Sequence, residues 1–311
     1  MTLAHWDDVE PRRPKWPALG GAWTDLGTAA GSRGVGLNRI DLGPGEISTP
    51  AHVHGDEEEI FFVLHGSGLS WQDGATHEIR AGDCLVHRPR AAAHTLRAGD
   101  DGLEVLAFGQ RLPVGGAHLP LVGIRWLKPS WTEVGQGDNP FGREQHLDWP
   151  EPTPRPGSIV NLDDVEGEYG GLMRRLAAPA GAERSGLNLA ALPPHAEGAP
   201  PHCHSADEEL FVVLDGEGML ELWAPPQPGA APQTEPHETQ PLRRGSVISR
   251  PPGTRIAHCL RAGGAGLTYL AYGTKEPNDI AYYPRSNKVY FRGIGLIGRL
   301  EPLEFHDGDA A

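Results

Sequence analysis

The chain has 311 residues and a formal net charge of −14, from 27 Lys and Arg against 41 Asp and Glu. This negative charge repels phosphate backbones and anionic lipid headgroups, so nucleic acid and membrane surfaces are excluded as expected partners. Three cysteines give no disulfide framework, and the first ten residues contain neither the basic nor the apolar region of a secretory signal. We therefore expect a cytoplasmic protein with a small-molecule substrate, and a homo-oligomer remains open as an alternative to a monomer.

Short strands joined by turns are the predicted elements along the chain. The 42 glycines and 30 prolines interrupt apolar runs that are too short for long helices. The apolar run over residues 59–64 is followed by His65-Gly66-Ser67-Gly68, which is typical of a strand that ends in a turn. The composition therefore predicts an all-β protein.

The second half of the chain repeats the first. Residues 31–68 and 181–218 align without a gap and are identical at 16 of 38 positions. A later segment, His94-x-Leu-Arg-Ala-Gly, recurs from His258. A repeat of this length indicates a duplicated domain. A proline-rich stretch at residues 149–157 disfavours regular hydrogen-bonded structure, so we predict an N-terminal domain over residues 1–150, a stiff connector, and a C-terminal domain over residues 158–311.

Each repeat contains one cluster of histidines and a glutamate. On a strand, His-x-His directs two imidazoles to the same face, and four further residues allow a turn before a glutamate that begins the next strand. A third histidine arrives from a later strand. The predicted metal ligands are His52, His54, Glu59 and His94 in the first repeat, and His202, His204, Glu209 and His258 in the second.

Three imidazoles and one carboxylate leave two positions of an octahedral metal shell open to water or substrate. This set of nitrogen and oxygen ligands suits Fe, Mn, Ni, Cu or Zn as a divalent ion, and the ligand types alone do not choose among them. We therefore expect a divalent transition metal at two sites per chain.

The pattern His-x-His-x4-Glu-x6-Gly, with its glycine at Gly66 and again at Gly216, resembles the first motif of the cupin superfamily. The segments 82–94 and 245–258 resemble the second motif, with Ala91 where the family has glycine and two extra residues in the later copy. The resemblance covers both halves. It implies a bicupin, with two tandem double-stranded β-helix (jelly-roll) barrels.

The resemblance also implies a choice of chemistries. A metal-dependent dioxygenase, an oxidoreductase acting on a small oxygen-rich or aromatic acid, is the main expectation. The alternatives are a manganese-dependent decarboxylase or other lyase, and a non-catalytic protein whose metal anchors a small ligand. An acidic substrate needs a cationic partner, so we predict that Arg88 and Arg250, which both precede a proline in the second motif, bind the substrate.

Overall fold

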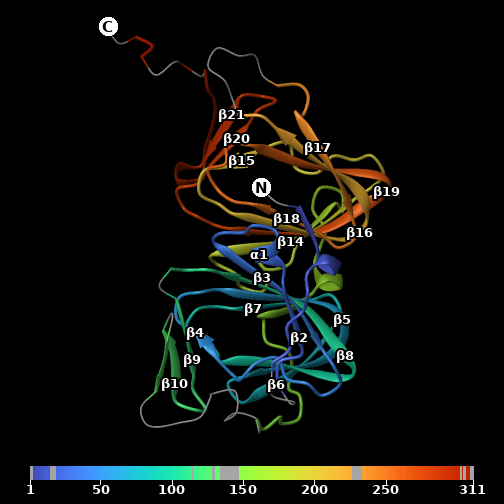
Figure 1. Ribbon diagram of the computed structural model, residues 1–311, viewed down its shortest axis with the longest axis vertical. Coiled ribbons are helices and arrows are strands. Elements are labelled where there is room, and N and C mark those ends of the chain that lie inside the picture. Colours follow the sequence, from blue (N-terminus) through green and yellow to red (C-terminus); the bar gives the residue numbers. More distant parts are fainter. Residues whose placement is uncertain are drawn as a thin grey trace.

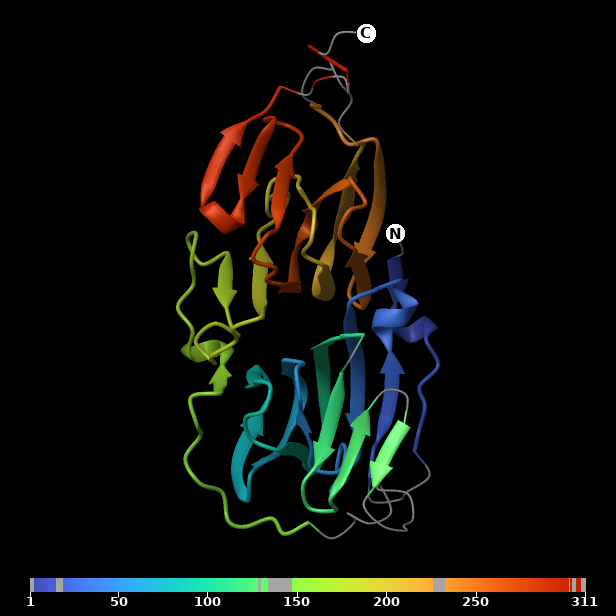
Figure 2. The ribbon, with the colours of Figure 1, turned by 90° about the vertical axis from the view of Figure 1, so that its left-hand side faces the viewer.

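The computed structural model describes residues 3–14, 19–113, 115–127, 130–133, 147–225, 233–301, 303 and 306–308. Within these ranges the chain forms two β-barrels, one above the other along the long axis of the molecule (Figures 1 and 2). Helical structure there is limited to single turns, namely α1 (Leu26–Ala29), η1 (Trp6–Asp8), η2 (Leu162–Asp164) and η3 (Arg292–Ile294). The all-β prediction is confirmed. None of these helices has the length and apolar character needed to span a membrane.

The N-terminal barrel combines a seven-stranded and a four-stranded antiparallel sheet. The large sheet contains β2 (Ala22–Asp25), β3 (Val35–Leu42), β5 (Glu59–Gln72), β6 (Ala75–Arg80), β7 (Asp83–His87), β8 (His94–Gln110) and β12 (Ile159–Asn161). The small sheet contains β4 (Val53–His54), β9 (Gly116–Leu119), β10 (Ile124–Leu127) and β11 (Ser130–Glu133).

The C-terminal barrel repeats this plan. Its large sheet contains β1 (Leu3–His5), β13 (Met173–Arg175), β14 (Ser185–Leu192), β16 (Glu209–Trp223), β17 (Glu238–Arg243), β18 (Ser246–Arg250) and β19 (Ala257–Thr274). Its small sheet contains β15 (Cys203–His204), β20 (Ile280–Tyr283), β21 (Lys288–Phe291) and β22 (Leu296–Arg299). The two predicted repeats therefore correspond to two barrels of the same topology.

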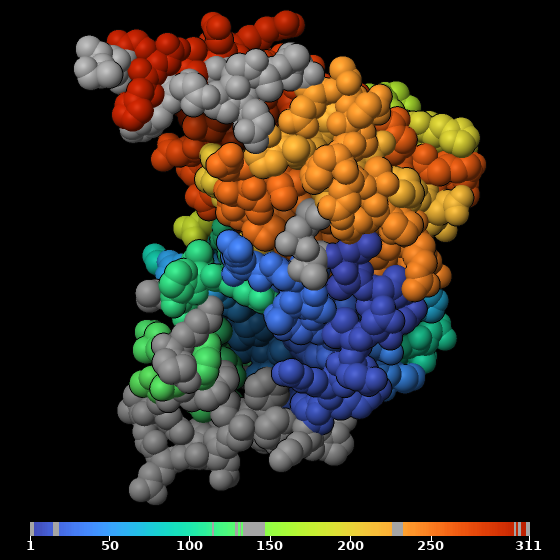
Figure 3. Space-filling view, turned by 45° about the horizontal axis from the view of Figure 1, so that its top comes forward, coloured from blue at the N-terminus to red at the C-terminus, as the bar shows by residue number. Residues whose placement is uncertain are grey.

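The two barrels exchange their first strands. Strand β1 pairs with β18 of the C-terminal barrel, and β12 pairs with β7 of the N-terminal barrel. The N-terminal segment accordingly lies against the C-terminal barrel (Figures 1 and 3). The domain boundary between residues 150 and 158 stays a prediction. Each large sheet is completed by a strand from the other side of that boundary.

The apolar run at the start of β5 is buried on both faces because it separates two cores. Ile60 and Phe62 belong to a cluster that also includes Leu210, Val212 and Tyr272 of the other half, so this core lies between the barrels. Phe61 and Val63, on the opposite face, lie in the core of the N-terminal barrel itself. A strand buried on both sides needs apolar residues at successive positions, which explains why this run does not alternate.

The glycine that closes the first motif marks a close backbone approach. Gly66 has φ +80°, and a Cβ there would lie 2.2 Å from the carbonyl oxygen of Gly102. Gly216 is in the same situation, with φ +78° and 2.2 Å to the oxygen of Gly266. Each stands at an irregularity in the pairing of a long strand, where only glycine fits both the dihedral angle and the space.

Candidate metal centres

The strand pairing assembles the first quartet from four positions. His54 lies in β4, Glu59 is the first residue of β5, and His94 is the first residue of β8. His52 and His94 form an isolated antiparallel bridge, in which the N–H of each donates to the carbonyl oxygen of the other at 2.9 and 3.2 Å. The second repeat has the same arrangement, with a bridge between His202 and His258.

The predicted ligands of the N-terminal barrel converge. One ligand atom from each of His52, His54, Glu59 and His94 lies within 4.8 Å of the others. Glu59 Oε2 is 2.9 Å from His94 Nε2, 3.4 Å from His54 Nε2 and 3.8 Å from His52 Nε2. The three imidazole nitrogens and the carboxylate oxygen thus lie close enough together to share one cation.

The predicted ligands of the C-terminal barrel converge in the same way around Glu209. Its Oε2 is 3.1 Å from His258 Nε2, 3.6 Å from His204 Nε2 and 3.8 Å from His202 Nε2. His202, His204 and Glu209 each place a ligand atom within 4.8 Å of the other two. Within the described part of the chain, Glu209 Oε2 and His258 Nε2 are buried and make no hydrogen bond. A cation would satisfy both of these atoms, so the residues fit a metal.

The pKa values of two ligand histidines and of both glutamates favour the protonation states that bind metal. Burial, with His94 and His54 close by, lowers the pKa of His52 to about 3. Burial likewise lowers the pKa of His258 to about 3. For Glu59 and Glu209 burial acts to raise the pKa, but the neighbouring histidines outweigh it and hold the pKa well below the ordinary value. Each centre therefore has one neutral imidazole, His52 or His258, and one ionised carboxylate ready for coordination at neutral pH.

Partners on Nδ1 orient the imidazoles. Nδ1 of His52 lies 3.0 Å from the carbonyl oxygen of Pro50, and Nδ1 of His202 lies 2.7 Å from that of Pro200. A carbonyl accepts only from a protonated Nδ1, so these contacts leave Nε2 as the nitrogen with the lone pair. The first histidine of each centre is thus oriented by the same kind of contact, from Nδ1 to the carbonyl oxygen of a proline two residues earlier.

Arg88 and Arg250 are not brought to equivalent places. Arg88 is exposed and donates to Glu183 at 2.8 Å, so the structure does not place it beside the quartet. Arg250 is buried and pairs across the sheet with Glu209, whereas the partner of Glu59 at that position is His87. The Arg-Pro pairs are therefore not structural equivalents.

His87 is the residue that the sequence reasoning missed, although its signal was present. His87 and Arg250 each stand five positions after a glycine, Gly82 and Gly245 respectively. Between this glycine and the last ligand histidine the second repeat is one residue longer, and the extra residue lies after Arg250. The ring of His87 stacks on His94 with centroids 3.7 Å apart, and burial holds its pKa well below the ordinary value.

The two centres differ in the space beside them. A cavity of about 520 Å³ adjoins His54, and it is walled by the small sheet of the N-terminal barrel, including His118, Arg125 and Trp126, and by Arg90. The cavity beside Glu209 is only about 10 Å³, enough for about one water molecule, and Arg250, Cys203 and Pro251 help to enclose it. Of the two centres, only the N-terminal one thus adjoins a described cavity that is large enough for a substrate.

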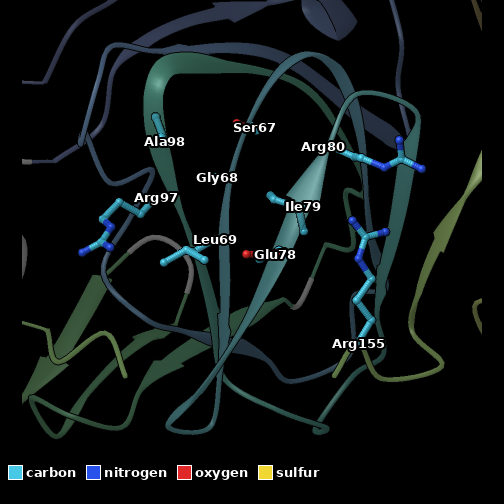
Figure 4. A pocket seen from close by; sticks show the side chains of 10 residues that line it. Ser67, Gly68, Leu69, Glu78, Ile79, Arg80, Arg97, Ala98 and Arg155 are labelled. Carbon is cyan, nitrogen blue, oxygen red and sulfur yellow. The ribbon is translucent and has the colours of Figure 1, made fainter. Parts of the chain in front are cut away.

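A separate groove of about 450 Å³ lies around the β5–β6 hairpin and β8 (Figure 4). It contains three arginines, of which Arg97 lies on the other side of the hairpin from Arg80 and Arg155. Arg97 lies over the ring of Trp149, and Arg155 is paired with Asp83 at 2.7 Å. None of the predicted metal ligands lines this groove.

Comparisons with known proteins agree with this architecture. Residues 38–109 match the family model of the cupin domain. The dimethylsulfoniopropionate lyase DddW of Ruegeria pomeroyi is 41% identical over 89 residues, which are 28% of this chain and 56% of the lyase. The match therefore spans about half the length of that relative.

Solved structures with two such barrels resemble the whole chain. Oxalate decarboxylase of Bacillus subtilis, which has Mn(II) centres, superposes with a TM-score of 0.60 at 15% identity, covering 90% of this chain and 78% of the enzyme. Oxalate decarboxylase of Lactobacillus farciminis gives 0.58 at 14% identity, covering 88% and 86%. At these identities the likeness establishes the shared fold.

Proposed function

We propose that this chain, whose residues 38–109 match the cupin domain and whose two barrels share the fold of oxalate decarboxylases, is a metal-dependent lyase that acts on a small carboxylate at its N-terminal centre. The observation that carries the proposal is the cavity of about 520 Å³ that adjoins the quartet at His54. The sequence alone favoured a dioxygenase. A lyase has better support, because the relatives found are a dimethylsulfoniopropionate lyase and oxalate decarboxylases.

The walls of this cavity suit a small anion with an apolar part. Arg90 and Arg125 supply positive charge, that of Arg90 being paired with Asp56 of the same wall, and Trp126 supplies an apolar face. The guanidinium of Arg90 is held by Asp56 at 2.6 Å and by the carbonyl oxygen of Gly55 at 2.9 Å, so its position is fixed before a substrate enters. A fixed cation binds a carboxylate without the entropic cost of ordering a free side chain.

A divalent metal held by the N-terminal quartet would supply a Lewis acid that polarises the substrate carboxylate. The protein contributes three imidazoles, of which His52 is neutral, the ionised Glu59 and the arginines of the cavity wall. Elimination or decarboxylation breaks a bond within one substrate and has no net requirement for dioxygen. We assign this chemistry to the N-terminal centre because the cavity at the C-terminal centre holds about one water molecule.

The proposal is tested with metal-loaded protein and two substrates in parallel. Dimethylsulfoniopropionate would be assayed for dimethyl sulfide and acrylate, oxalate would be assayed for formate and carbon dioxide, and an oxygen electrode would monitor both reactions. We expect product from at least one substrate without equivalent oxygen uptake. Oxygen consumed in proportion to substrate would instead indicate the dioxygenase, and tight ligand retention without product would indicate a binding protein.

Variants then locate the reaction. We expect Glu59→Ala to abolish turnover and Glu209→Ala to retain it. Arg125→Ala should raise KM at least tenfold with a smaller change in kcat, because the arginine binds the carboxylate in both the ground state and the transition state. Equal losses in Glu59→Ala and Glu209→Ala would contradict the assignment to one barrel.

A further inference from the structure

The C-terminal extension, which follows β19 and contains β20, β21, η3 and β22, provides a carboxylate that contacts one imidazole of the C-terminal centre. Asp279 precedes β20, and its side chain is completely buried. Its Oδ2 accepts from Nδ1 of His204 at 2.7 Å, which leaves Nε2 of that histidine directed toward Glu209. A buried carboxylate on Nδ1 fixes both the tautomer and the orientation of a ligating histidine.

Asp279 is itself held firmly. Its Oδ1 accepts from the backbone N–H groups of Ala206 at 3.0 Å and Asp207 at 3.1 Å. Arg292, in η3, lies 3.5 Å from Asp279 Oδ2 and also pairs with Asp207. The carboxylate therefore has little freedom to leave His204, and the loop that carries the ligand is tied to the C-terminal extension.

The N-terminal centre lacks this contact because of one residue. His54 pairs with Ala117, as His204 pairs with Ala281, so Gly115 occupies the position of Asp279 two residues earlier. Glycine has no side chain to offer, and Gly115 lines the large cavity. Nδ1 of His54 instead faces Glu57 of its own loop, at the longer distance of 3.4 Å.

A second side chain of the extension covers the C-terminal centre. The ring of Tyr283, in β20, stacks on His202 with centroids 5.8 Å apart and an interplanar angle of 26°. Nζ of Lys288, in β21, lies over the ring of Tyr283, 5.1 Å from its centroid. The extension thus contacts two of the predicted ligands, which is consistent with the small cavity at this centre.

We propose that Asp279 is a positioning residue that makes the C-terminal centre the tighter of the two metal sites. The proposal rests on metal binding by both quartets, which is part of the proposed function, but it does not depend on turnover. The N-terminal centre exchanges its metal faster, because its cavity is open and Gly115 stands where the C-terminal centre has Asp279.

Zinc release tests the proposal without any substrate. Protein loaded with two zinc ions per chain is mixed with an excess of a colorimetric chelator, and release is followed in time. Glu59→Ala and Glu209→Ala, each with one remaining centre, assign the phases. We expect two phases in the unaltered protein, with the slow phase belonging to the C-terminal centre.

Asp279→Ala should accelerate the slow phase about 10-fold to 100-fold and leave the fast phase unchanged. Asp279→Asn should have a smaller effect, because the amide oxygen can still accept from His204. Glu57→Gln is the matched control, and it should leave the slow phase unchanged. The melting temperature of the metal-free Asp279→Ala protein reports any purely structural effect.

An unchanged slow phase in Asp279→Ala would overturn the proposal, as would a slow phase that belongs to the N-terminal centre. A lower melting temperature of the metal-free protein with unchanged zinc release would show that Asp279 only stabilises the fold. Two phases that respond as expected in a protein without lyase activity would support this inference while contradicting the proposed function.

Discussion

Glu58 and Glu208 each bury their carboxylate against the opposite barrel. Glu58 accepts from the backbone N–H of Glu183 at 2.8 Å and from Ser185 Oγ, and Glu208 accepts from Gly34 N–H at 2.6 Å and from Ser32 Oγ at 2.7 Å. Each of them neighbours a ligand glutamate, so strand alternation points it away from the metal centre. The carboxylates are buried there, because the outer face of this wall is the contact between the barrels.

Glu58→Gln and Glu208→Gln should each lower the free energy of unfolding by roughly 1–3 kcal/mol, because a buried charged acceptor of several hydrogen bonds is lost. The metal content should stay at the level of the unaltered protein. Denaturant titration at pH 7 measures the change, and Asp101→Asn, at an exposed position, serves as the control. A change no larger than that of the control would contradict the role of the buried carboxylates.

The next prediction concerns the metal content of variants of the ligand glutamates. Glu59→Ala and Glu209→Ala should each remove about one metal ion per chain, because each takes away the central carboxylate of one quartet. Elemental mass spectrometry after purification without metal-chelating chromatography gives the stoichiometry, and the double variant should carry none. Unchanged metal content in both single variants would rule out the two-centre model.

Because Arg88 is exposed and Arg250 is buried, their alanine variants should differ in the free energy of unfolding. Arg88→Ala should change the free energy of unfolding by less than about 1 kcal/mol, because its pair with Glu183 is exposed. Arg250→Ala should cost about 3 kcal/mol or more, because Glu209 would lose a buried positive charge. Chemical denaturation of both variants checks the contrast, and similar small costs would show that Arg250 does not compensate Glu209.

The metal-free protein should lose stability as the pH falls below about 6.5. The folded-state pKa of His52 and of His258 is lowered to about 3 by burial, so the unfolded chain binds protons there while the folded chain does not. Each of these histidines should contribute about 1.4 kcal/mol per pH unit across that window. His204 acts in the opposite sense: burial lowers its pKa, but its bond to Asp279 and the nearby carboxylates raise it overall.

Urea unfolding of the metal-free protein at pH 7, 6 and 5 measures this dependence. His52→Gln removes one of the titrating groups, so its stability should fall less steeply with pH. An identical slope in His52→Gln and the unaltered protein would show that His52 titrates normally in the folded state.

The sequence by itself determined the two barrels and the eight candidate ligands. Both follow from local spacing: strand alternation places His52 and His54 on one face, and the repeat places His202 and His204 in the same relation. Gly66 and Gly216 were identified from their fixed distance to the ligand glutamates. The turn predicted after residue 64 is wrong, because β5 continues to Gln72 and Gly66 stands at an irregularity of its pairing.

Only the tertiary structure decided which residues surround the ligands. The cross-strand partner of Glu59 is His87, and that of Glu209 is Arg250. His87 and Arg250 stand at the same distance from the preceding glycine, whereas alignment of the two Arg-Pro pairs suggested a different register. Asp279 reaches His204 from 75 residues further along the chain. Such contacts depend on how strands and extensions pack, and side-chain periodicity within a strand carries no information about what packs against its outer face.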